Sequence, residues 1–208
     1  MKNILKFSLV VLFLFSIGVT KGQVTWGPKV GLNLASMSFK SSGMSFNPKM
    51  IVGFQVGAVA DMTINDVWSF QPGLLLNMKG SKYTVMGDSW TIKPLYLEIP
   101  LHLMYKIAEQ GSTGKYYVFT GPYFSMGVGG KIKDASGSQT IKFGGSSSDD
   151  LRRWDGGADF GLGWEYQSFQ ISVQYQAGIS NTIPNASSDE KSRHRVFGLT
   201  VVYLLKNK

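Results

Sequence analysis

The sequence predicts an all-β protein, an eight-stranded antiparallel transmembrane β-barrel with short periplasmic turns and long extracellular loops. Beyond residue 23, apolar residues alternate with polar or small ones, and no stretch keeps the 3.6-residue period of an amphipathic helix. The alternating segments reach about 9–12 residues, as a tilted membrane strand needs, whereas soluble strands are usually about 5–6 long. Short and long connections alternate, so the two ends of the strands face different compartments.

The composition excludes several classes of protein. The 208 residues include 25 Gly, 13% are aromatic and only 16% are charged, which favours strands over helices. The absence of Cys excludes disulfide scaffolds, thiolate metal sites and thiol nucleophiles. The two His residues offer little for metal chemistry, so we expect neither a metal nor a cofactor.

The N-terminus has the pattern of an export signal. Lys2 and Lys6 precede an apolar stretch over 7–19, and small residues follow at 20 and 22. The alternative, a membrane anchor, needs about 20 apolar residues. We therefore expect residues 1–22 to be a cleaved signal peptide and residues 23–208 to form one barrel domain.

The eight expected strands each have one apolar face. In the first, Val30, Leu32 and Leu34 alternate with Lys29, Gly31, Asn33 and Ala35. The eighth is the least clear because both of its faces are apolar. The strands are expected at 26–35, 52–61, 70–79, 97–106, 116–128, 154–165, 169–178 and 196–205, with long connections near 38–49, 80–94, 130–153 and 180–195.

Aromatic residues distinguish a membrane barrel from a soluble sandwich or a lipocalin-like barrel, which would also alternate. If the short turns near 63–66, 107–114 and 167–168 are periplasmic, many aromatics fall at the periplasmic ends of their strands. Membrane barrels carry such girdles at the lipid–water boundary. The expected girdle contains Trp26, Trp68, Tyr105, Trp164, Tyr166 and Tyr203.

The polar faces should line a narrow lumen, because eight strands leave space only for side chains. We expect a polar network there, in which Lys29 meets acids across the lumen. A plug of ion pairs and amides is favoured over a proton or cation path. Inward glycines on the sixth strand would make room for Tyr117, Phe119 and Tyr123. The network residues are Lys29, Gln71, Glu98, Asp155, Asp159 and Glu165, with Asp61 and Lys106 beside them.

An enzymatic interpretation would start from Glu98 and His102, which share a face of the fourth strand. Their Cα atoms would be about 13 Å apart, so a serine such as Ser125 would have to complete a site. No spacing marks a nucleophile, so we expect no catalytic residues. His102 is expected to form a hydrogen bond in the lumen, and His194 to lie in a loop.

The long connections and adjoining strand ends, Lys79 included, hold more basic than acidic residues. Such residues can pair with phosphates and carboxylates of lipopolysaccharide in the outer membrane. Nucleic-acid binding is the competing explanation of a basic chain, but the basic residues follow no recognisable binding motif. Outer-membrane lipid, lipopolysaccharide and an envelope protein are therefore the expected partners, and no nucleic acid is expected.

Short motifs along the mature chain resemble the PorT-like outer-membrane β-barrel family. They are Gly27-x-Lys29-x-Gly31-x-Asn33, Phe70-Gln71-Pro72, Leu97-Glu98-Ile99-Pro100-Leu101, Gly121-Pro122-Tyr123 and Asp159-Phe160-Gly161-Leu162-Gly163. The resemblance implies an eight-stranded barrel in the outer membrane of a Gram-negative bacterium.

The function expected is a structural or interaction role at the cell envelope. A narrow channel for small solutes or ions is the alternative, and a lipid-modifying barrel enzyme comes third.

Overall fold

The computed structural model describes residues 24–41, 44–46, 48–85, 88–108, 111, 113–187 and 189–205. The expected signal peptide, residues 1–22, lies outside these residues, so its cleavage stays a prediction. Within the described residues, no helix is long and apolar enough to cross a membrane.

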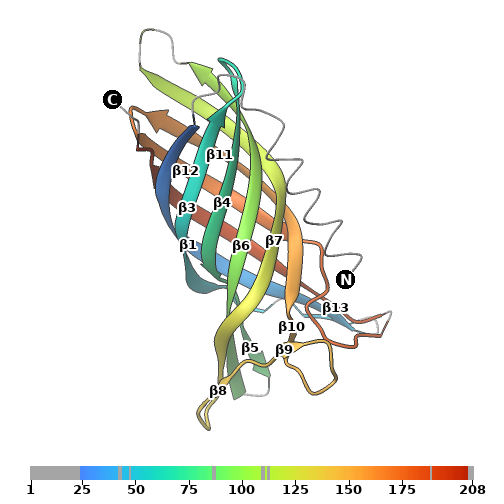
Figure 1. Cartoon of the computed structure of the whole chain (residues 1–208). Helices are drawn as coiled ribbons and strands as arrows, with labels where there is room; N and C mark the ends of the chain where they lie inside the picture. Colours follow the sequence, from blue (N-terminus) through green and yellow to red (C-terminus); the bar gives the residue numbers. More distant parts are fainter. Residues whose placement is uncertain are drawn as a thin grey trace.

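Eight long antiparallel strands form a closed ring (Figure 1). Each strand pairs with the next one around the ring, and the last strand closes on the first over the register Lys29↔Val202 to Lys40↔Lys191. The predicted eight-stranded barrel is confirmed. Its strands are β1 (Val24–Ser41), β3 (Ile51–Thr63), β4 (Trp68–Met78), β6 (Asp88–Ala108), β7 (Gly114–Lys133), β11 (Trp154–Tyr166), β12 (Phe169–Gly178) and β13 (Lys191–Tyr203).

The two ends of the barrel differ. One end, the short-turn end, carries the connections 64–67, 109–113 and 167–168, and Trp26 bridges to Leu205 there. The opposite end, the long-loop end, holds five short strands, several of them labelled at the lower end of Figure 1. They are β2 (Met44–Phe46), β5 (Ser81–Val85), β8 (Ser138–Thr140), β9 (Phe143–Gly144) and β10 (Leu151–Arg152).

Several strands run further toward the long-loop end than the sequence predicts. The strand β6 begins at Asp88 rather than at 97, β7 continues to Lys133 rather than 128, and β13 begins at Lys191 rather than 196. Much of the expected loop 80–94 is therefore a paired strand, with β5 on one side of β6 and β7 on the other. Outside the membrane, both faces of a strand can be polar. The alternation of apolar and polar residues, by which a strand is predicted from sequence, is therefore absent in these extensions.

The two faces of the barrel have opposite chemistry. The apolar side chains of Phe54, Leu76, Phe160 and Val173 point outward and are exposed in the isolated chain. Among the described residues, buried polar side chains outnumber buried apolar ones. A soluble core has the reverse arrangement. The exposed apolar face is the one that a membrane barrel presents to lipid.

Glycines on β11 make room for aromatic rings on β7. The cross-strand pairs are Gly157 with Tyr123, Gly161 with Phe119 and Gly163 with Tyr117. A Cβ added at Gly157 would lie 2.7 Å from the Tyr123 ring, and one at Gly161 would overlap the Phe119 ring. These contacts support the expectation that the glycines relieve crowding rather than leave a cavity.

Replacing Gly161 with Ala should lower the free energy of unfolding by about 1–3 kcal/mol, because the new methyl group displaces the Phe119 ring from a filled lumen. The heat-modifiable gel mobility of the folded barrel measures this effect across a urea series. The matched control is Gly129→Ala on β7, where an added Cβ has no atom within 4 Å. Equal losses of stability in the two variants would contradict the crowding explanation.

Candidate functional site

The first polar cluster fills the lumen near the short-turn end. Lys106 Nζ donates to Asp61 Oδ2 at 2.7 Å and to Glu165 Oε2 at 2.9 Å. Gln170 Nε2 donates to the same carboxylate oxygens at 3.0 Å each. Gln71 Nε2 donates to Gln170 Oε1 at 3.0 Å, and these residues come from strands on opposite sides of the ring. The lumen is therefore crossed by side chains at this level.

The middle of the lumen holds two separate contacts. His102 Nε2 lies 2.9 Å from Asp159 Oδ2. Lys29 Nζ donates to Gln174 Oε1 at 3.3 Å. Among the described residues, Lys29 forms no ion pair, so its expected contact with an acid is not found. An amide reaches it instead.

The second polar cluster surrounds a lysine that the sequence analysis assigned to the loop charges. Lys79 is fully buried, and its Nζ lies 2.7 Å from Glu98 Oε2 and 3.2 Å from Asp155 Oδ2. The same nitrogen lies 4.2 Å from the centre of the Tyr123 ring and 5.3 Å from that of Tyr96. Two carboxylates and two aromatic faces thus stabilise one buried cation.

Glu98 is fully engaged in this second cluster. Its Oε1 accepts hydrogen bonds from Asn77 at 2.9 Å and Gln176 at 3.0 Å, and its Oε2 accepts one from Ser125 at 2.8 Å. Ser125 therefore donates to the carboxylate, whereas His102 contacts Asp159. The described residues do not assemble Glu98, His102 and Ser125 into an acid–base and nucleophile set.

A third tie crosses the lumen near the long-loop end. The Tyr96 hydroxyl lies 3.2 Å from His194 Nε2, and the two strands that carry them are opposite each other in the ring. The expectation that His194 lies in a loop is wrong, because β13 extends past it and turns the side chain inward. A run of five polar or charged residues from 191 to 195 hid this strand from the sequence analysis.

The sequence analysis ended the third strand at Lys79 but left this lysine out of the lumen network. Its side chain points into the lumen like those of Gln71 and Asn77, which stand an even number of residues before it on β4. Gly80 follows with φ +144°, where the chain leaves the strand. A Cβ at Gly80 would meet the Ile92 carbonyl oxygen. The chain can thus pass closely by β6 while Lys79 still points inward.

The six aromatic residues of the expected girdle lie at the short-turn end. Trp68 packs on Tyr105 with ring centres 5.0 Å apart, and Trp164 stacks on Tyr166 at 5.3 Å. Tyr203 packs on Phe169 at 4.9 Å, while Trp26 is exposed beside its bridge to Leu205. Their role as a membrane-boundary girdle stays a prediction.

A patch of lysines covers the outer side of the sheet at the long-loop end. Lys49 bridges directly to Lys82, and Lys93 directly faces Lys131 across β6 and β7. Thr91 lies between Lys82 and Lys133 on the same face. We name this patch the lysine face; it consists of Lys49, Lys82, Lys93, Lys131 and Lys133.

The lysine face is electrostatically unbalanced. Like charges that lie directly opposite on neighbouring strands destabilise a sheet. In the part of the chain that the structure describes, no carboxylate forms an ion pair with these lysines. Leu95, Leu97 and Ile99 continue the outward face of β6 toward the barrel. The lysines therefore stand just above the apolar belt.

The closed ring, the apolar exterior and the polar interior define an integral outer-membrane β-barrel protein of a Gram-negative bacterium. The outer membrane protein beta-barrel domain family matches residues 16–184, and the chain belongs to this family.

Several solved structures are similar to the chain. Ail of Yersinia pestis in complex with the heparin analogue sucrose octasulfate has 15% identity and a TM-score of 0.43, covering 88% of this chain and 99% of its own. Neisserial surface protein A has 12% identity and a TM-score of 0.48, covering 87% and 98%. The N-terminal barrel domain of Pseudomonas aeruginosa OprF has 13% identity and a TM-score of 0.40, covering 89% and 100%. No curated protein matches the sequence.

Replacing Lys79 with Met should destabilise the barrel by about 3–5 kcal/mol, because Glu98 and Asp155 then remain buried without their cation. The triple variant Lys79→Met, Glu98→Gln and Asp155→Asn should recover much of this loss. Urea unfolding followed by gel mobility measures both. Lys133→Met, an exposed lysine with neutral cross-strand partners, is the control. If Lys79→Met had the same free energy of unfolding as Lys133→Met, the central role of Lys79 would be contradicted.

Proposed function

We propose that the protein is a non-conducting, non-enzymatic barrel that works through its outer surface, where the lysine face binds the phosphate groups of outer-leaflet lipopolysaccharide. The observation that carries this proposal is the pairing of Lys93 with Lys131 and of Lys49 with Lys82. Such lysine pairs destabilise the sheet when no anion is bound and become favourable once an anion lies between the two charges.

The position of the lysine face supports a lipid ligand over a soluble one. The lysines follow the apolar residues of β6 on the same face of the barrel. We expect the headgroups of the outer leaflet to begin at this level. Basic residues near an anionic membrane surface each contribute about 1 kcal/mol of binding, and the contribution falls with salt. Five lysines on one rigid sheet give a multivalent contact.

The filled lumen supports a role at the surface over the alternative of a narrow channel. Gln71 meets Gln170, and Tyr96 meets His194, across the full width of the ring. Between these ties, Lys79 is held by two acids and two rings. An ion would have to break several buried contacts to pass.

A partner protein in the envelope remains part of the proposal, as does kinship with PorT-like barrels. Among the described residues, the short-turn end has brief turns over 64–67 and 167–168, whereas the long-loop end has long connections and additional short strands, so we expect a partner at the long-loop end.

The native protein should be electrically silent in planar bilayers, because the lumen is crossed by side chains at three levels. The measurement is single-channel conductance in symmetric salt, with a general porin as the positive control. Stable conductance steps that disappear on changing Asp155 to Asn would overturn the closed-lumen part of the proposal.

Changing Lys131 to Glu should have opposite effects in two environments. In detergent without phosphate, the new pair with Lys93 should raise the free energy of unfolding by about 0.2–1 kcal/mol. In bilayers that contain lipopolysaccharide, the same variant should bind the glycolipid more weakly. Urea unfolding and co-sedimentation with labelled lipopolysaccharide measure the two effects.

Lys133→Glu is the matched control for stability, since its direct cross-strand partners Thr91 and Ser138 are neutral, and the variant therefore removes no pair of directly opposed like charges. Dephosphorylated lipopolysaccharide is the control for binding. If Lys131→Glu bound phosphorylated glycolipid as tightly as the native chain, the proposal would be wrong.

A further inference from the structure

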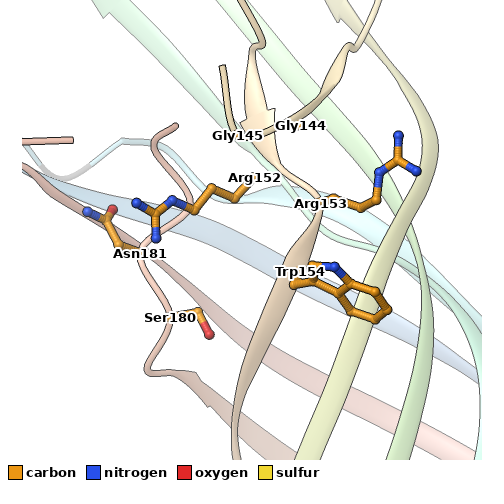
Figure 2. Close-up of a pocket in the computed structure, with 7 residues that line it drawn as sticks. All are labelled: Gly144, Gly145, Arg152, Arg153, Trp154, Ser180 and Asn181. Carbon is orange, nitrogen blue, oxygen red and sulfur yellow. The ribbon is translucent and has the colours of Figure 1, made fainter. Parts of the chain in front are cut away.

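A hollow of about 620 Å³ lies at the long-loop end, and none of the residues that line it belongs to the lysine face. It is formed where the connection after β7 meets the connection after β12 (Figure 2). Its polar and aromatic lining comes from Arg152, Arg153, Trp154, Ser180 and Asn181, and we name it the arginine hollow. None of these residues belongs to the lumen clusters.

The walls of the arginine hollow are held by hydrogen bonds. Asn181 Nδ2 donates to the Glu190 carbonyl oxygen at 2.8 Å, and its Oδ1 accepts from the Ser192 N–H at 2.9 Å. Ser180 Oγ donates to the Gly156 carbonyl at 3.2 Å. These bonds fix the wall of the hollow that Ser180 and Asn181 form.

The arginines face the hollow without carboxylate partners. Asp155, two residues after Arg153, pairs with Lys79 in the lumen. On the other side, Asp149 accepts a hydrogen bond from the Ser146 N–H at 2.8 Å, and Asp150 accepts one from the Lys142 N–H at 2.7 Å. Over the described ranges, Arg152 and Arg153 form no ion pair, and Arg153 Nη2 donates only to the Phe143 carbonyl at 3.2 Å. Two guanidinium groups therefore leave donors free for an anion.

Trp154 adds an aromatic surface at the membrane boundary. Its side chain is 67% exposed, and it begins the outward row of β11 that continues to Phe160 and Leu162. Tryptophan favours the headgroup level, where one part of the indole is wet and another contacts apolar groups. The apolar face of a sugar ring can pack on such an indole.

The two charges stand apart. Figure 2 shows the Arg152 side chain reaching toward Asn181, while Arg153 lies on the other side of the strand, above Trp154. A single phosphate would engage one of them. A sugar that carries anionic groups at two separated positions would engage both.

We propose that the arginine hollow binds the bis-phosphorylated sugar headgroup of an outer-leaflet glycolipid, with one phosphate on each arginine and the sugar against Trp154. This site deepens the proposed function and rests on it, since both assign phosphate-bearing glycolipid as the ligand. The hollow distinguishes the headgroup by its chemistry, whereas the lysine face attracts any dense array of phosphates.

The test uses the full mature chain in nanodiscs and three probes: an acylated disaccharide with two phosphates, the same lipid with one phosphate, and the acyl-free bis-phosphorylated disaccharide. Native mass spectrometry measures the affinity for each. The native chain should bind the bis-phosphorylated lipid about tenfold more tightly than the mono-phosphorylated one, because one additional charge-assisted hydrogen bond contributes about that much to the affinity. Arg152→Gln and Arg153→Gln should each remove this preference.

Two further variants sharpen the result. Trp154→Ala should weaken binding of both lipids several-fold, whereas Trp154→Phe should largely preserve it. Arg193→Gln is the matched control, since it removes an exposed arginine of β13 outside the hollow and should leave the preference unchanged. Heat-modifiable mobility verifies that each variant is folded.

The possible outcomes separate this inference from the proposed function. If the arginine variants keep the preference for the bis-phosphorylated lipid while Lys131→Glu loses lipopolysaccharide binding, the proposal for the arginine hollow is wrong and the proposal for the lysine face is supported. If neither kind of variant changes binding, both are overturned. Equal affinity for the acyl-free sugar would overturn a membrane glycolipid as the occupant.

Discussion

The closure of β13 on β1 is the constraint on which the rest of this protein depends. In hydrocarbon an unpaired backbone group costs several kcal/mol, so a membrane sheet must have no edge. Closure with eight strands leaves a narrow interior that side chains can fill. The polar network, the glycine–aromatic pairs and the apolar exterior all follow from closing the ring at this size.

A narrow polar interior stabilises the fold only if its charges are balanced. The inward acids Asp61 and Glu165 share Lys106, and Glu98 and Asp155 share Lys79. The two lysines sit at different depths, so each half of the lumen has its own ionic centre. This arrangement holds opposite sides of the ring together as a packed apolar core does in a soluble domain.

Sequence reasoning succeeded where the membrane imposes a pattern and failed where it does not. The apolar alternation of residues such as Leu32 and Phe160 predicted the strands, because lipid requires it on every second position. The extensions of β6, β7 and β13 were missed, because water tolerates polar residues on both faces. His194 was placed in a loop for the same reason. Lys79, the last residue of the expected third strand, was counted with the loop charges although it lies on the polar face of that strand. The arginine hollow could not be predicted from the sequence, since it forms only where two connections that are distant in the sequence meet.

The length of β6 separates the loop tips from the apolar belt of the barrel. Its 21 residues measure about 70 Å along the strand, and even at a tilt of about 45° they span more than the hydrocarbon thickness of about 30 Å. Lys93 therefore stands on a continuous rod anchored in the barrel, and its height above the bilayer does not vary with the loop tips. Sequence change at the loop tips would leave the distance between the lysine face and the apolar belt of β6 unchanged.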